Sequence, residues 1–123
     1  MIDNAVCIGK NAAPKLLWTN PNPNDSFSGQ TITFGSEYSG YIVELKQSTS
    51  VSNVGRIYVP VGKANKHLFA TTSYDSNQGY RYLNSATANS ISFGEAKNDN
   101  LGRFVVNNSM AIPTRVYGVN WSI

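Results

Sequence analysis

The sequence predicts an all-β fold: a single antiparallel β-sandwich, jelly-roll-like, with short strands and no substantial helix. Three observations predict it. Short segments alternate polar and apolar residues, turn-forming residues recur between these segments, and no window keeps an apolar stripe at helical spacing over three turns. Only 14% of the 123 residues are charged, and the other polar residues are mainly Asn, Ser and Thr, which favour turns and strands over helices.

Nine segments have the length and composition of strands: residues 15–18, 30–34, 41–47, 55–61, 67–72, 79–84, 90–96, 103–106 and 114–121. Turn signals separate them at residues 21–25, 35–36, 39–40, 53–55, 62, 75–79, 84–90, 97–102 and 106–109. Ile32 and Phe34 alternate with threonines, and Ile91 and Phe93 alternate with serines, as expected for strands with one buried face. Pro60 has no backbone donor, so it predicts that its strand lies at a sheet edge or ends early.

The expected sandwich domain comprises residues 15–123, with no internal repeat and no linker. Residues 1–14 are less periodic, and we interpret them either as an arm that docks on a neighbouring chain or as a flexible leader. This segment lacks the basic start and apolar centre of a secretory signal. Cys7 is the only cysteine, so no intrachain disulfide can form, which fits assembly in a reducing cytoplasm.

The composition argues against several classes of function. The net charge of +3 comes from scattered Lys and Arg residues, without the clustered basic face that nucleic-acid binding requires. No apolar run approaches the roughly 20 residues of a membrane span. His67 is the only histidine, and no metal-ligand or phosphate-cradling motif is present, so we expect no metal and no cofactor. No carboxylate pair or nucleophile motif indicates catalysis, so we expect a protein that is not an enzyme.

Three blocks of sequence resemble one known family when they are taken together. They are LLWTNPNPNDSFSGQTITF at 16–34, SEYSGYIVELK at 36–46, and ISFGEAK at 91–97 with NNSMAIPTRVYG at 107–118. In this order they resemble the C-terminal receptor-binding, or tip, domain of tail-fibre proteins from tailed phages that infect Gram-positive bacteria. The segment 47–89 carries no part of the resemblance.

The resemblance implies a virion-surface protein on the phage tail or capsid, assembled in the host cytoplasm. It further implies a homotrimer that contacts other virion proteins, and distal loops that touch a glycan or protein of the bacterial surface. Two alternatives stay open. One is a structural virion component, such as a head-fibre or capsid decoration or a tail adaptor, without receptor binding. The other is a free carbohydrate-binding module.

The stretch TSYDSNQGYRYLN provides the candidate ligand-binding site. Its aromatic faces alternate with amide and charged groups, the combination that a polyhydroxylated ligand needs, and tyrosine has few torsions to freeze on binding. The candidate residues are Tyr74, Asp75, Asn77, Gln78, Tyr80, Arg81 and Tyr82. The alternative interpretation is an ordinary hairpin with a polar tip and cross-strand tyrosines.

Two further segments contain aromatic residues whose role the sequence leaves open. Trp18 precedes a stiff connector that contains two prolines, so it is either a core residue beneath that connector or an exposed platform for a sugar ring. In the last predicted strand, Tyr117, Val119 and Trp121 share one face and predict either a core contact or an oligomer interface. Gly118 predicts a bulge or a close approach of another part of the chain.

Overall fold

The structure is a computed structural model that describes residues 13–62, 64–72, 78–100 and 103–120. These residues contain no helix and form nine strands. The strands are β1 (Lys15–Thr19), β2 (Gln30–Thr33), β3 (Gly40–Ser48), β4 (Val51–Pro60), β5 (Ala64–Thr72), β6 (Gln78–Thr87), β7 (Ser90–Asn100), β8 (Arg103–Val106) and β9 (Met110–Val119).

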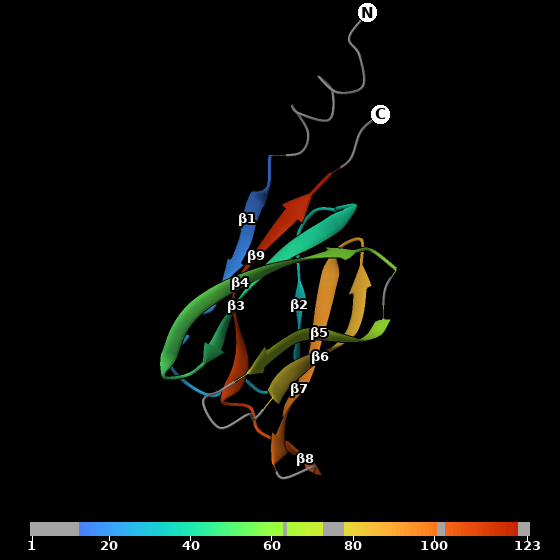
Figure 1. Cartoon of the computed structure of the whole chain (residues 1–123). Helices are drawn as coiled ribbons and strands as arrows, with labels where there is room; N and C mark the ends of the chain where they lie inside the picture. The colour runs from blue at the N-terminus through green and yellow to red at the C-terminus, as the bar shows by residue number, and fades with distance from the viewer. Residues whose placement is uncertain (1–12, 63, 73–77, 101–102, 121–123) are drawn as a thin grey trace, which may run out of the picture.

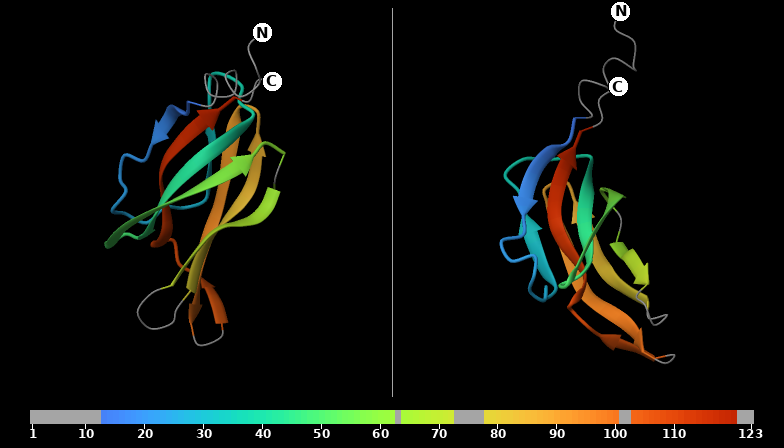
Figure 2. Two further views of the ribbon diagram at one scale, coloured as in Figure 1. Left: turned by 45° about the horizontal axis from the view of Figure 1, so that its top comes forward. Right: turned by 60° about the vertical axis from the view of Figure 1, so that its left-hand side comes forward.

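The strands form two antiparallel sheets that lie one over the other (Figures 1 and 2). The first sheet has the order β1-β9-β3-β4, and we call it sheet A. The second has the order β2-β7-β6-β5, with β8 pairing with β7, and we call it sheet B. The expected all-β, sandwich-like fold is therefore confirmed, whereas the jelly-roll assignment stays a prediction.

All nine predicted segments are strands, but several of their ends differ from expectation. The predicted turn at 53–55 is wrong, because these residues lie inside β4, where Val54 and Gly55 pair with β3, and the turn falls at Thr49 and Ser50 instead. β7 continues to Asn100 because β8 provides a partner for its second half. Pro60 ends β4 at the edge of sheet A, as its missing donor predicts.

The last strand begins earlier than its sequence indicates. β9 starts at Met110 and contains Pro113, a residue that normally interrupts a sheet. The pairing with β3 slips at this point, because Glu44 pairs with Arg115 whereas Leu45 pairs with Pro113, and Thr114 is the extra residue. The Thr114 hydroxyl donates a hydrogen bond to the backbone oxygen of Glu44 at 3.1 Å, so the bulge is held by a side chain.

The core lies between the two sheets and contains two groups of aromatic rings. Trp18, Phe27 and Phe93 have ring centroids 5.7 to 6.5 Å apart. Tyr41 contacts both Phe34 and Tyr38 further along the sandwich. The buried aliphatic residues that fill the space between them are Val43, Leu45, Val59, Leu83, Ala86, Ile91, Ala111, Ile112 and Val116.

Two polar side chains connect the sheets across this core. The Tyr41 hydroxyl on β3 donates to the Thr87 backbone oxygen on β6 at 2.5 Å. Burial raises the pKa of Tyr41 to about 12; the backbone at Ser90 opposes this rise, and nearby Tyr38 adds to it. The second side chain is Arg81 of β6, whose contacts bear directly on the predicted site.

Candidate functional site

The outer face of sheet B contains a groove with a volume of about 590 Å³. Its polar and aromatic walls come from three neighbouring strands. β6 contributes Tyr80, Tyr82 and Asn84, which point outward because side chains alternate along a strand. β2 contributes Thr31, and β7 contributes Ser92, Glu95 and Lys97.

Irregular pairing between β6 and β7 shapes the floor of this groove. Arg81 pairs with Ala96 and Leu83 pairs with Phe93, so two residues of β7 lie opposite the single residue Tyr82. One step further along, β6 has the extra residue. Such bulges increase the local twist of a sheet, and they often re-aim side chains beside functional sites. Gly94 is one of the two β7 residues opposite Tyr82, and a glycine inside a strand often marks a bulge, so this residue was the available sequence signal for the first irregularity.

The groove has the chemical groups that a sugar ligand needs. Two tyrosines offer aromatic surface, while the Asn84 amide, the Lys97 ammonium and the hydroxyl of Thr31 offer hydrogen-bonding groups on the same face. Thr31 already donates to the Ser92 hydroxyl at 2.9 Å, which fixes the position of both hydroxyls. The sequence predicted Tyr80 and Tyr82 but not Asn84, Lys97 or Thr31. Lys97 and Thr31 lie on β7 and β2, strands that are distant from Tyr80 and Tyr82 in sequence.

The prediction that Arg81 contacts the ligand is wrong. Arg81 lies between Tyr80 and Tyr82 in sequence and therefore points to the opposite face, where it is fully buried. Its guanidinium donates to the backbone oxygens of Ala111 at 2.7 Å, Gly94 at 2.9 Å and Met110 at 3.1 Å. Since all these acceptors lie inside the sandwich, Arg81 connects the sheets and cannot reach a ligand.

The buried arginine has no carboxylate within ion-pair distance among the described residues, yet it remains charged at neutral pH. Burial lowers the pKa of Arg81 to about 10, and the negative charge of Glu95 opposes this fall. The guanidinium also lies 5.0 Å above the ring of Phe27. Ala111, one of its acceptors, has φ of 47°, a left-handed conformation that is uncommon for a residue with a side chain.

The other predicted ligand residues are only partly visible. Tyr74, Asp75 and Asn77 lie outside the described residues. Gln78 begins β6, but its side chain is not among those described. Of the predicted residues that are described, the structure therefore brings together Tyr80 and Tyr82 and excludes Arg81.

Trp18 packs on the core, as the first of its two interpretations predicts. β1 has a bulge between Leu16 and Trp18, and Trp18 meets Phe27 edge-on with 5.8 Å between the ring centroids. The connector after Trp18 is held at Asn20. The backbone N–H of Asn20 donates to the Thr114 oxygen at 2.8 Å, and its side-chain amide donates to the Pro113 oxygen at 2.9 Å.

The three residues of the predicted oligomer interface do not share one environment. Val119 is buried within the chain, which agrees with the alternative of a contact inside the chain and contradicts an oligomer contact for this residue. Tyr117 is half-buried on the outer face of sheet A, and Trp121 lies outside the described residues. Gly118 marks a close approach, as predicted: a β-carbon built there would lie 2.5 Å from Cδ1 of Tyr38 and 2.8 Å from Cδ1 of Leu17.

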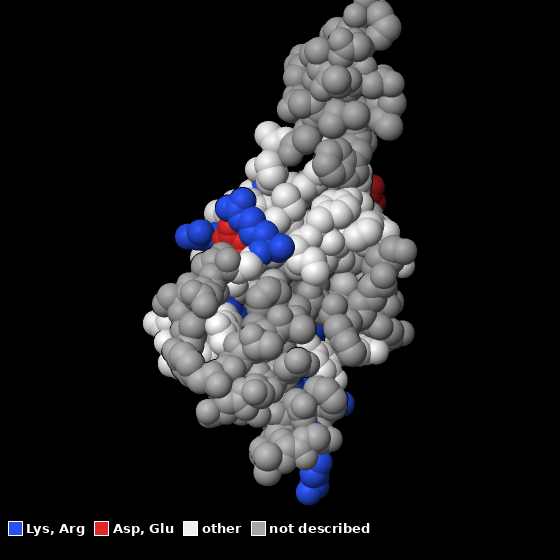
Figure 3. All heavy atoms as spheres, viewed as in Figure 1, with Lys and Arg blue, Asp and Glu red and all other residues white. Residues whose placement is uncertain are grey.

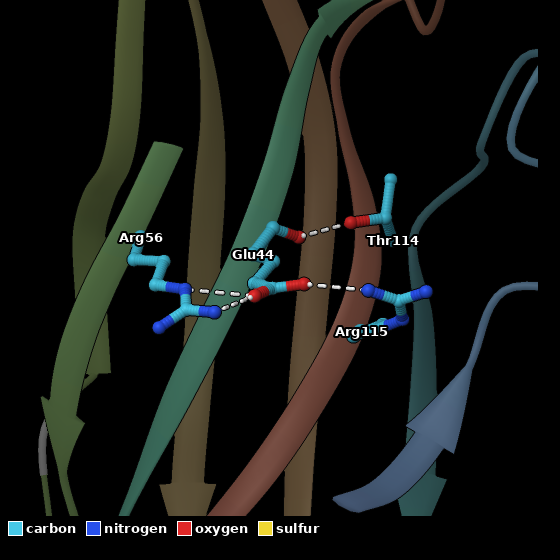
Figure 4. A network of polar contacts seen from close by, with 4 residues as sticks. All are labelled: Glu44, Arg56, Thr114 and Arg115. Atoms are coloured by element: carbon cyan, nitrogen blue, oxygen red, sulfur yellow. Dashed lines mark hydrogen bonds and ion pairs between the residues drawn. The ribbon is translucent and has the colours of Figure 1, made fainter. Parts of the chain in front are cut away.

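The outer face of sheet A carries an ionic network that the sequence did not indicate. Figure 3 shows basic side chains gathered around an acidic patch on one side of the molecule, and Figure 4 shows Glu44 between Arg56 and Arg115. Glu44 accepts from Arg56 at 2.7 Å and lies 3.5 Å from Arg115. Lys46, on the same strand, donates to Asn24 Oδ1 at 2.7 Å and to the Pro23 oxygen at 3.2 Å.

The His, Cys, Asp and Glu side chains of the described residues form no group of three or more that could hold a metal ion. Within the same residues, no helix has the length and hydropathy needed to span a bilayer.

Comparisons with known proteins provide no family for this chain. A scan against family models, a search of curated proteins and a search of solved structures each found no match.

Proposed function

We propose that the protein is a virion-surface module of a tailed phage that adheres to a glycan of the bacterial surface through the groove on sheet B. The observation that carries the proposal is the position of Tyr80 and Tyr82 beside the Asn84 amide and the Lys97 ammonium on one exposed face. Aromatic rings pack on the C–H groups of a sugar, and fixed polar groups bond to its hydroxyls. No step of catalysis is part of this function.

The sequence blocks at 16–34, 36–46 and 91–118 support a place on the virion, because they resemble tail-fibre tip domains. That resemblance also leads us to propose a homotrimer that contacts other virion proteins. The trimer is testable by light scattering at micromolar concentration. A small monomer would count against the fibre-like arrangement while leaving glycan binding open.

A pull-down of the purified protein on intact Gram-positive cells and isolated cell walls, together with a glycan array, tests the proposal. We expect binding that falls at least tenfold in Tyr82→Ala and in Tyr80→Ala. Val106→Ala is the matched control, since Val106 is exposed on β8 and does not line the groove. Silence on all cells, walls and glycans, or equal binding by all variants, would refute the use of this groove.

A structural virion component without receptor binding is the second candidate. Val105 and Val106 are exposed on β8, and apolar side chains on an exposed strand are typical of a docking surface. Incorporation of a Val105→Ser, Val106→Ser variant into particles distinguishes the candidates. Loss of incorporation by a protein whose parent never bound cells favours the structural role.

A further inference from the structure

An apolar row crosses the outer face of sheet A, on the side opposite to the groove. Leu16 pairs with Tyr117, Tyr117 with Ile42, and Ile42 with Tyr58, so the row includes one residue from each of the four strands. Neighbouring strands lie about 4.8 Å apart, so the row is about 14 Å long. Leu16 is 49% exposed and Tyr58 is 43% exposed at the two ends of the row, and Ile42 and Tyr117 between them are half-buried.

The ring of Tyr58 lies in the space that a side chain at Gly40 would occupy. A β-carbon built on Gly40 would lie 2.8 Å from both Cε1 and Cζ of Tyr58, so the ring covers the glycine backbone. An aromatic ring that rests on a sheet loses little freedom when a ligand packs on it, and this reduces the entropic cost of binding.

A charged row runs beside the apolar one, two residues further along each strand and therefore about 7 Å away. Glu44 lies in its centre and pairs with Arg56 on one side and Arg115 on the other. Arg56 bonds Glu44 closely, whereas Arg115 remains 3.5 Å away, and the two side chains are 68% and 53% exposed. Arg115 thus meets Glu44 through Nη1 at the limit of hydrogen-bonding distance.

A pocket of about 340 Å³ adjoins the charged row and is lined by Arg115, Glu44 and Lys46. Lys46 is only 8% exposed, and its ammonium donates to neutral oxygens of Pro23, Asn24 and Thr49. Two cations, Arg115 and Lys46, and one carboxylate, Glu44, therefore line the pocket, a local excess of one positive charge, and Arg56 adds a further cation on the other side of Glu44. A cationic pocket of this kind attracts an anion.

We propose that this face of sheet A is a second saccharide site, specific for an anionic sugar. The sugar ring packs on the row formed by Ile42, Tyr58 and Tyr117, and its carboxylate or phosphate substituent reaches the pocket beside Arg115. Guanidinium groups bind such oxyanions through paired hydrogen bonds. The proposal does not depend on the groove of sheet B, which lies on the opposite face of the sandwich.

The charges favour this ligand over a second copy of the chain. The chain has a net charge of +3, and the face has a local excess of cations, so contact between copies would bring like charges together. An anionic sugar neutralises the same charges. Self-association through this face would therefore contradict the proposal, and the variants described below detect it.

NMR titration of the labelled full chain tests the proposal with four probes: glucose, glucuronate, glucose 6-phosphate and inorganic phosphate. We expect glucuronate, glucose 6-phosphate or both to shift amides of β3, β4 and β9, with at least tenfold tighter binding than glucose or phosphate alone. The two charged sugars distinguish a carboxylate from a phosphate ligand. Binding should weaken when salt is raised from about 0.05 to 0.5 M.

Variants test whether the apolar row and the charged row bind the sugar. Arg115→Gln and Tyr58→Ala should each weaken the charged sugar at least tenfold, while Arg103→Gln on β8 should leave it unchanged. Arg115 is exposed, so its variant is expected to fold even if Tyr58→Ala does not. The proposal is overturned if glucose or phosphate alone binds as tightly as glucuronate and glucose 6-phosphate. It is also overturned if no probe shifts the amides of β3, β4 and β9, or if Tyr58→Ala converts an oligomer to a monomer.

Discussion

Replacement of Arg81 by methionine is expected to destabilise the protein by about 3–5 kcal/mol. The change removes a guanidinium that bonds three buried backbone oxygens at 2.7, 2.9 and 3.1 Å. An acceptor left unpaired in the interior costs about 1–3 kcal/mol, and relief of the cost of burying the cation offsets part of that sum. The predicted loss is large against the about 5–15 kcal/mol by which domains of this kind are usually stable.

Urea unfolding followed by tryptophan fluorescence measures this loss, because Trp18 packs on the same core. Arg81→Lys keeps the charge but loses the planar guanidinium whose separate N–H groups reach the three oxygens, so it should lose nearly as much stability as Arg81→Met. Lys97→Met, an exposed position on the outer face of sheet B, is the control and should change stability by less than about 0.5 kcal/mol. An Arg81→Met protein as stable as the parent would show that the hydrogen bonds to the carbonyl oxygens add nothing to the free energy of unfolding, and this result would refute the prediction.

Three further predictions concern other features of the sandwich. Tyr41 has a folded pKa raised to about 12 from its usual 10, so its contribution is intact below pH 10 and is lost as pH rises from 10 to 12. The free energy of unfolding, measured from pH 10 to 12, should therefore fall by about 1–2 kcal/mol more in the wild type than in Tyr41→Phe. Arg81, with its lowered pKa, acts in the opposite direction, but its effect is the same in both proteins and cancels in the difference. Parallel curves for the two proteins would disprove the assignment. Gly118→Ala should cost about 1–3 kcal/mol in thermal or urea unfolding, because the new methyl group meets the ring of Tyr38, and a neutral result would mean that the ring moves freely. Glu44→Gln should cost about 1 kcal/mol at low salt, with a smaller loss at 1 M salt, because both arginine partners are largely exposed; a salt-independent loss would contradict an electrostatic cause.

The sequence was informative about strands because alternation is a local property. Ile32, Phe34, Ile91 and Phe93 face inward as their spacing predicts, since one buried face of a strand forces period two. Pro60 marked a sheet edge for an equally local reason, its missing donor.

The site was less predictable because its shape depends on which strands become neighbours. Thr31 and Tyr82 are far apart in sequence, and only the order β2-β7-β6 brings both to one groove. The error at Arg81 had a different cause. Alternation already placed Arg81 on the face opposite to Tyr80 and Tyr82, but a buried arginine is so uncommon that a surface role was the natural expectation.

The position of β9 in sheet A has a consequence for how the chain folds. β9 lies between β1 and β3, so the first strand has no neighbour in its sheet until the last one is inserted. The acceptors of Arg81 on Met110 and Ala111 also arrive only with that strand. Assembly thus requires contacts between distant parts of the sequence before either sheet is complete, and proteins of such topology fold slowly, in milliseconds to seconds.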